Sequence, residues 1–347
     1  MRTIPNKTTM KKNIIFLAIL TISQGCLGQS KTQKQEVKAD NIGFAIVDDN
    51  VAFSHSDNSV TMSVAPKNLN GFKVYKTISE AMKSSKDVYI LDLSSQSLTS
   101  IPEEIKTLTN LKSLDLSFNN IKNIPDWLSE LDSLIELDMQ SNELSSIPLT
   151  FLKMKNLTHL NLGMNNLSEL PKDIGNLSNL VVFECTNNKL KELPNSIGDL
   201  KNLYHLEIYS NELNSLPETI GNCSSLVNLN FSYNKLSKLP STIGNLNKLT
   251  WLYFDENFIS VLPDGLTELT NLTYFGMSDN KIETLPDNFG NLKKLYGFAM
   301  NNNKLKDLPM SFFSMKSLGD IHLEKNELSI ETKNKLKKKF NQIPLYL

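Results

Sequence analysis

The chain repeats its own outline every 23 residues. Counted from Val88, ten consecutive units follow without an insertion, and a truncated eleventh unit begins at Leu318. Two neighbours, "LTHLNLGMNNLSELPKDIGNLSN" at 157–179 and "LVVFECTNNKLKELPNSIGDLKN" at 180–202, show the match. A fixed period of this length is typical of solenoids, in which stacked units bury a shared core. The period therefore predicts a repeat array over residues 88–328.

Each unit contains one short strand and one polar column. In "LTHLNLGMN", Leu160 and Leu162 alternate with Asn161 and Gly163, which is the period of a strand with one buried face. Asparagine then recurs at 23-residue intervals, at Asn119, Asn142, Asn165, Asn188, Asn211, Asn234, Asn257, Asn280, Asn303 and Asn326. Because an amide side chain both donates and accepts, these residues are expected to satisfy buried backbone groups at the strand ends.

Proline, glycine and cysteine occupy the rest of the unit. Proline follows an apolar residue at a fixed point, at Pro102, Pro125, Pro148, Pro171, Pro194, Pro217, Pro240, Pro263, Pro286 and Pro309. It lacks an N–H and so favours an irregular outer arm. Glycine recurs where a missing Cβ relieves crowding in the outer turn, at Gly175, Gly198, Gly221, Gly244 and Gly290. Cys185 and Cys223 replace leucines of the pattern and are expected as buried free thiols.

The full pattern, L-x-x-L-x-L-x-x-N-x-L-x-x-L-P, resembles that of leucine-rich repeat proteins, in the short subclass with "LP" in each unit and often "IGNL" later. The resemblance covers roughly residues 75–345. It implies an α/β repeat solenoid, a curved horseshoe with a parallel concave sheet and an irregular or 3-10 convex side. A solenoid also needs capped ends, and residues 72–87 and 329–347 are expected to supply helical caps, the second with Leu336 and Phe340 inward.

The N-terminus has the order of an export signal. Lys11 and Lys12 precede an apolar run over residues 14–22, and "SQGCLGQS" follows. Two routes fit: cleavage after Gly28, giving a signal peptide over residues 1–28, or lipoprotein processing after residue 25 with a lipid on Cys26. Residues 29–40 are expected to form a flexible spacer, and residues 41–71 a small segment with a hairpin turning at 48–50. Either route predicts an exported protein that is secreted, periplasmic or anchored to the envelope.

The variable strand positions on the concave side are where a partner would be recognised. The position between the two strand leucines holds Asp92, Asp115, Asp138, Asn161, Glu184 and Glu207 in the first six units. Neighbouring strands lie ~4.8 Å apart, so the carboxylates form a row whose mutual repulsion a basic partner would relieve. Calcium is disfavoured because one carboxylate per strand falls short of the ~6–8 oxygen ligands it takes.

Later units bring aromatic residues to the same face. Tyr209, Tyr233, Trp251, Tyr253, Phe258 and Tyr274 fall in four successive units. The register turns Trp251, Tyr253 and Tyr274 outward and Leu252, Phe254 and Phe275 inward. Exposed aromatic residues with polar neighbours are typical of a protein hot spot or a sugar-stacking platform, although packing between strands would explain them equally well.

Several function classes are disfavoured. The charges nearly cancel, with 36 Lys+Arg against 37 Asp+Glu, so no basic field draws the chain to nucleic acid. His159 and His205 would lie about 10 Å apart, and no nucleophile, phosphate loop or metal motif accompanies them. No cofactor, metal site or catalytic residue is predicted.

The sequence thus favours a non-catalytic module that binds a protein partner. The aromatic residues would anchor that partner, and Asp115, Asp138, Glu184 and Glu207 would orient it. Two alternatives stay open: binding of a glycan or cell wall through the same aromatic residues, and an intracellular signalling scaffold if the N-terminus is not a signal. A membrane is expected to be involved only through a lipid on Cys26.

Overall fold

The computed structural model describes residues 17–20, 51–56, 59–64, 69 and 71–347. These residues belong to two compact units, residues 1–72 and 73–347, which are described separately. Within the described residues, no helix is both long and apolar enough to span a membrane.

The first unit contains a three-stranded antiparallel sheet in the order β1-β3-β2. Its strands are β1 (Leu17–Leu20), β2 (Val51–Ser56) and β3 (Ser59–Val64). A hairpin is therefore present in the segment 41–71, but its strands flank residues 57–58. The turn expected at 48–50 lies outside the described residues, as do Cys26, the spacer at 29–40 and most of the predicted export signal.

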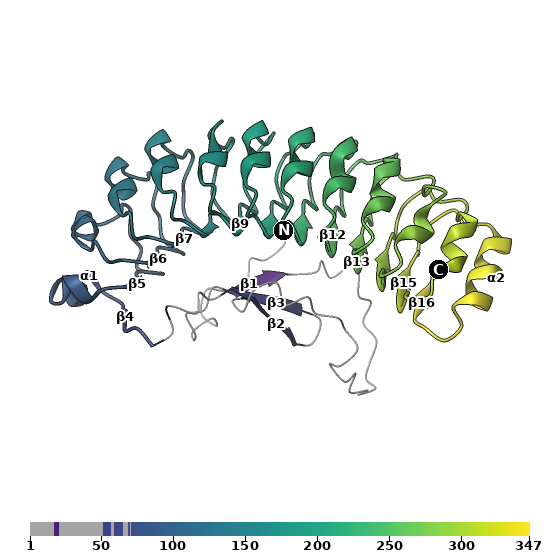
Figure 1. The fold of residues 1–347 in the computed structure, drawn as a ribbon, viewed down its shortest axis with the longest axis horizontal. Coiled ribbons are helices and arrows are strands. Elements are labelled where there is room, and N and C mark those ends of the chain that lie inside the picture. The colour runs from purple at the N-terminus through teal and green to yellow at the C-terminus, as the bar shows by residue number, and fades with distance from the viewer. Residues whose placement is uncertain (1–16, 21–50, 57–58, 65–68, 70) are drawn as a thin grey trace, which may run out of the picture. The chain divides into compact units, whose positions relative to one another are not determined.

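The second unit is a curved solenoid built on one parallel sheet, with its strands on the concave side (Figure 1). The 13 strands follow in chain order, and each pairs with the next. Each repeat contributes one three-residue strand: β5 (Ile90–Asp92), β6 (Ser113–Asp115), β7 (Glu136–Asp138), β8 (His159–Asn161), β9 (Val182–Glu184), β10 (His205–Glu207), β11 (Asn228–Asn230), β12 (Trp251–Tyr253), β13 (Tyr274–Gly276), β14 (Gly297–Ala299) and β15 (Asp320–His322).

The convex side is made of short 3-10 helices (Figure 1). They are η4 (Glu103–Thr107), η5 (Asp126–Glu130), η6 (Leu149–Lys153), η7 (Ile174–Asn176), η8 (Asn195–Asp199), η9 (Glu218–Asn222), η10 (Ser241–Asn245), η11 (Asp264–Glu268), η12 (Phe289–Asn291) and η13 (Met310–Ser314). In eight of them the repeating proline directly precedes the helix in extended or similar backbone, as at Pro194 before η8.

Close packing of these turns explains the repeating glycine. A Cβ at Gly198 would lie 2.3 Å from the Thr219 carbonyl oxygen, and one at Gly244 would lie 2.1 Å from that of Gly265. No side chain fits at either distance. The crowding expected from the sequence is therefore confirmed as backbone contact between neighbouring repeats.

The asparagine column forms a ladder between repeats. The Asn211 Nδ2 donates to the carbonyls of Ile208 and, in the preceding repeat, Cys185, at 3.1 and 2.9 Å. Its Oδ1 accepts the N–H of Leu190, also in the preceding repeat, at 3.0 Å. Since the side chain is buried, these bonds replace water for backbone groups that would otherwise lack partners. This confirms the structural role predicted for the asparagines.

Both ends of the sheet are capped. At the N-terminal end, β4 (Val74–Tyr75) pairs with β5, and helix α1 follows at Ile78–Met82, so the helical part is shorter than the expected 72–87. At the other end, α2 (Ile330–Lys339) buries Leu336, and the Phe340 that follows it is buried as well. The short strand β16 (Leu345–Tyr346), which has no signal in the repeat, pairs with β15.

Candidate functional site on the concave sheet

Each three-residue strand turns its first and last side chains outward and its middle one into the core. Leu206, Leu252 and Phe275, for example, are all but inaccessible. Over β5 to β15 the outward positions hold seven carboxylates and no lysine or arginine. The carboxylates are Asp92, Asp115, Glu136, Asp138, Glu184, Glu207 and Asp320. The chain contains 36 Lys+Arg, so their absence from this face is a strong charge segregation.

The first part of the acidic row has a local structural role. The Oδ1 atoms of Asp92, Asp115 and Asp138 each accept the backbone N–H two residues later, at 2.9, 2.8 and 2.7 Å. Asn161 and Asn230 make the same bond further along the row. Because one acceptor oxygen suffices, aspartate and asparagine are interchangeable here. Asp115 and Asp138 were predicted as a solvated or partner-binding acidic row, and this bond was not predicted, although the mixture of Asp and Asn in the column pointed to it.

In the middle of the sheet, Glu184 and Glu207 occupy the column that elsewhere holds the Asp or Asn side chains bonded to the backbone. The Glu207 Oε1 lies 3.6 Å from His205 Nε2, and Glu184 Oε1 lies 3.9 Å from the same nitrogen, both too long for hydrogen bonds. In the described part of the chain, neither ring nitrogen of His205 and neither carboxylate oxygen of Glu207 has a hydrogen-bond partner, although all four atoms are buried. We call Glu136, His159, Glu184, His205, Glu207 and Asn228 the central polar cluster.

Further members of the central polar cluster carry unsatisfied atoms. They are Oε1 of Glu136, Nε2 of His159 and both amide atoms of Asn228. Leaving buried polar atoms unpaired is costly in a folded protein, and a ligand that supplies the missing hydrogen bonds recovers that cost. Glu184 and Glu207 were predicted from their repeat position, whereas their grouping with Glu136 and Asn228 was not.

Burial shifts the ionisation of the cluster. It raises the pKa of Glu136 and of Glu184 to about 7 and lowers the pKa of His205 to about 3. The pKa of Glu207 is also well above its usual value, through burial first and the Glu184 charge second. At neutral pH His205 is therefore neutral and Glu136 and Glu184 are about half protonated, so a nearby cation would favour their ionised form.

The aromatic residues fall into two groups. Trp251, Tyr253 and Tyr274 occupy outward positions of β12 and β13, as predicted, and are half-buried. The rings of Trp251 and Tyr274 meet edge to face, with centroids 5.9 Å apart and planes 88° apart. Tyr296, which the sequence analysis did not single out, continues this group at 6.1 Å from Tyr274.

The other predicted aromatic residues lie beyond the strands. Tyr209 and Tyr233 follow β10 and β11, and Tyr233 occupies a turn position with a φ of 55°. Phe258 is half exposed and has the Lys281 Nζ 4.9 Å from its ring centroid. The structure therefore groups Trp251, Tyr253 and Tyr274 on the sheet and places the remaining three in the loops that follow it.

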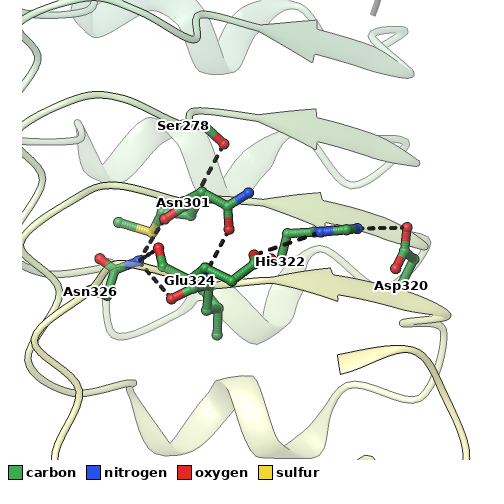
Figure 2. A network of polar contacts seen from close by, with 8 residues as sticks. Ser278, Asn301, Asp320, His322, Glu324 and Asn326 are labelled. Atoms are coloured by element: carbon green, nitrogen blue, oxygen red, sulfur yellow. Dashed lines mark hydrogen bonds and ion pairs between the residues drawn. The ribbon is translucent and has the colours of Figure 1, made fainter. Parts of the chain in front are cut away.

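The C-terminal end of the face carries a third polar group, shown in Figure 2. The His322 Nε2 lies 3.1 Å from Asp320 Oδ2, and its Nδ1 lies 3.7 Å from Glu324 Oε2. The ring stacks on Tyr346 of β16, with centroids 4.4 Å apart. The backbone N–H of Glu324 donates to Asn301 Oδ1. The backbone N–H of Asn301 in turn donates to Ser278 Oγ. This network links three successive repeats with the cap.

Metal-ligating side chains and cysteines have the following arrangement in the described part of the chain. Within the described residues, no group of three or more His, Cys, Asp or Glu side chains is arranged to hold a metal ion. Cys185 and Cys223 are buried free thiols, as predicted, and burial raises the pKa of each to about 12.

Comparisons with known proteins agree with the repeat. Leucine-rich repeat family profiles match residues 86–144, 156–177, 225–246 and 271–292. No curated protein sequence matches the chain. An internalin from Listeria monocytogenes has a TM-score of 0.66 at 22% identity, covering 76% of this chain and 82% of its own.

Two plant receptors are also similar in structure. The leucine-rich repeat ectodomain of the Arabidopsis thaliana receptor kinase GASSHO1/SCHENGEN3, solved with CASPARIAN STRIP INTEGRITY FACTOR 2, has a TM-score of 0.63 at 31% identity over 70% of this chain and 33% of its own. The plant peptide hormone receptor RGFR1, solved with RGF2, has a TM-score of 0.59 at 30% identity over 74% and 46%. This chain thus spans less than half of either receptor chain. With its 23-residue period, its asparagine ladder and its parallel concave sheet, the chain is a leucine-rich repeat protein.

Proposed function

We propose that the concave sheet binds a basic segment of a protein partner. The observation that carries this proposal is the charge segregation of the outward strand positions, where seven carboxylates and no lysine or arginine occur. A partner rich in Lys and Arg is attracted to such a face and oriented by it, whereas an anionic ligand is repelled.

The unsatisfied atoms of the central polar cluster support the same partner. The Glu207 carboxylate and the Glu136 Oε1 lack donors within the described residues, and Lys and Arg side chains consist of donors without acceptors. Burial raises the pKa of both glutamates, so an approaching cation favours their ionised form and its binding should release protons from them.

The aromatic group supports a protein rather than a sugar. Sugar-stacking platforms present flat ring faces, but the Trp251 and Tyr274 planes are 88° apart and those of Tyr274 and Tyr296 are 65° apart. Half-buried rings of this kind resemble the anchor residues of protein interfaces. The two plant receptors, solved in complex with CASPARIAN STRIP INTEGRITY FACTOR 2 and with RGF2, are similar solenoids that hold a partner.

A peptide array of varied net charge tests the proposal. The full chain is applied to 15-residue peptides, and we expect the bound set to be enriched in Lys and Arg. Glu184→Gln/Glu207→Gln should weaken binding of those peptides at least fivefold. Glu169→Gln/Glu192→Gln, which removes two exposed charges outside the outward strand positions, should not. Bound peptides without basic enrichment, or equal losses in the two variants, would refute the proposal.

We further propose that the protein acts outside the cytoplasm, because residues 1–28 have the order of an export signal. Mass spectrometry of the N-terminal peptide from native cells tests this. A start at Gln29 indicates a soluble exported protein and a lipid on Cys26 indicates a tethered one. An intact Met1 or Met10 indicates an intracellular scaffold and overturns the proposal.

A further inference from the structure

Four neighbouring strands carry a row of unlike residues at their first outward position. Trp251 on β12 pairs with Tyr274 on β13, Tyr274 pairs with Gly297 on β14, and Gly297 pairs with Asp320 on β15. Tyr296 directly precedes Gly297. Two aromatic residues, a glycine and a carboxylate thus lie side by side at the same level of the sheet.

The glycines of this region make room for rings. A Cβ on Gly297 would lie 2.6 Å from Cδ1 of Tyr274, and one on Gly319 would lie 2.1 Å from Cε2 of Tyr296. Neither glycine has a positive φ, so the backbone does not require glycine at either position. Glycine weakens a strand, and its presence here marks a close approach of another group, namely the tyrosine ring of the preceding repeat.

The rings held in this way are not part of the core. Tyr296 is 49% exposed, and Trp251 and Tyr274 are half-buried. Their planes stand at 88° and 65° to one another, so a group placed against them meets more than one ring face or edge. The fold thus holds three partly exposed rings in place, and two glycines leave the space that the Tyr274 and Tyr296 rings occupy.

A carboxylate completes the group. Asp320 is 28% exposed at its side chain, and its Oδ2 lies 3.1 Å from His322 Nε2. Its charge acts on Tyr274, since it raises the pKa of that residue, after burial and the neighbouring Tyr296. The outward positions of β12 to β15 contain no lysine or arginine.

We propose that Tyr274, Tyr296 and Asp320, flanked by Trp251 against the Tyr274 ring, form a binding site for one cationic side chain, preferentially the guanidinium of an arginine. Aromatic faces attract cations, and the guanidinium plane both stacks on rings and bonds a carboxylate. This inference rests on the proposed function, because the arginine is one that the basic partner would supply. It assigns the aromatic group a specific chemical task, which is to recognise charge rather than to bury apolar surface.

Trp251 can report on the site directly. The chain has two tryptophans, and Trp127, half-buried within η5, can be replaced by Trp127→Phe so that Trp251 is the only one left. The fluorescence of this full-length variant is titrated at constant ionic strength with N-acetyl-arginine amide and, separately, with N-acetyl-citrulline amide. Citrulline has nearly the same shape as arginine but no charge, so the comparison isolates the cation.

We expect a saturable change with the arginine probe and at least threefold weaker binding of the citrulline probe. Asp320→Asn should narrow this preference, and Tyr274→Leu should reduce arginine binding at least fivefold. Gly297→Ala, which displaces the Tyr274 ring without removing it, should act like Tyr274→Leu. The exposed Phe118 on another repeat provides the matched control, because Phe118→Ala should leave both titrations unchanged. Circular dichroism identifies any variant that does not fold.

Equal binding of both probes, no saturable response to arginine, or a preference that survives in Tyr274→Leu would each overturn the inference. The proposed function is judged separately on the peptide array. If Glu184→Gln/Glu207→Gln still weakens the binding of basic peptides while the arginine and citrulline probes bind equally well, the acidic face binds its partner without this site. If basic peptides are not enriched at all, the proposed function fails, whatever the arginine titration shows.

Discussion

His205 and Glu207 lie on the same strand and face the same side, with Nε2 and Oε1 3.6 Å apart and no hydrogen bond between them. Burial lowers the pKa of His205 to about 3 and raises that of Glu207, so at neutral pH the ring is neutral and forms no ion pair with the carboxyl group. Within the described residues, the ring nitrogens of His205 and the carboxylate oxygens of Glu207 have no hydrogen-bond partner, and burying such atoms is costly. Because they lie on the concave face, where we propose that a partner binds, that partner would supply the missing hydrogen bonds.

Glu184→Gln should change how stability depends on pH. Because the pKa of Glu184 is about 7 in the folded chain, against a usual value near 4.5, the folded state holds its proton more tightly than the unfolded state. This carboxyl therefore costs nothing below about pH 4.5 and destabilises the fold increasingly up to about pH 7. The variant should match the wild type at pH 4.5 and exceed it by about 1–3 kcal/mol at pH 8.

Urea denaturation at a series of pH values measures this difference. Glu169→Gln, at an exposed position, serves as the control and should follow the wild-type profile. Parallel profiles for Glu184→Gln and the wild type would show that Glu184 ionises as freely in the folded chain as in the unfolded one.

Asp138 should tolerate asparagine but not alanine. Its Oδ1 accepts the Gln140 N–H at 2.7 Å, a bond that an amide oxygen can make equally well. Burial and the Asp115 charge raise its pKa, so removing the charge is no loss. Asp138→Asn should be at least as stable as the wild type at pH 7, and Asp138→Ala should lie about 1–2 kcal/mol below it. Equal stabilities of the two variants in thermal unfolding would show that the bond contributes nothing.

The asparagine ladder should be sensitive at every step. Asn211→Ala removes the acceptor for Leu190 and the donors for Cys185 and Ile208, all in buried surroundings. We expect a loss of about 2–3 kcal/mol in the free energy of unfolding. Asn214→Ala, three residues later at an exposed position, is the matched control and should change stability by less than about 0.5 kcal/mol. A small effect at Asn211 would mean that water replaces the lost bonds.

Two adjacent convex glycines should respond differently to the same change. A Cβ on Gly244 would meet the Gly265 oxygen at 2.1 Å, whereas the nearest atom to a Cβ on Gly265 is the Ser241 oxygen at 3.2 Å. Gly244→Ala must push two repeats apart and should cost about 1–3 kcal/mol. Gly265→Ala should cost much less, since it also reduces the entropy of the unfolded chain. Similar melting temperatures for both variants would contradict the packing described for this side.

The repeat made most of the scaffold predictable. Leucine, asparagine and proline each recur at one position of the 23-residue unit, where the backbone environment is the same in every repeat. The strand register of Leu206 or Phe275 therefore followed from spacing alone. Features that occur once had no such support. The two-residue strands β4 and β16 depend on backbone pairing at the ends of the sheet and have no repeated signal.

The site was only partly predictable for the same reason. Trp251 and Tyr274 were placed correctly because they occupy repeat positions. The ring contact between Tyr274 and Tyr296 was not predicted, because it depends on glycines one repeat later that leave room for the two rings. The hydrogen bond of Asp138 to Gln140 and the unsatisfied atoms of Glu207 arise from side-chain geometry, which residue spacing does not encode. Spacing thus predicts which face a side chain occupies, whereas its partners depend on the length and shape of its neighbours.

The ladder has a further consequence for how the molecule opens. Each asparagine amide bonds its own repeat to the one before it. The bonds of the ladder therefore join only neighbouring repeats, and none of them links distant parts of the array. Thermal fluctuations should therefore fray the array from its ends, and the repeats carrying Glu207 and Trp251 lie several steps inward from either cap. Amide hydrogen exchange should be slowest in the middle of the array, where a partner would find a surface that is already ordered.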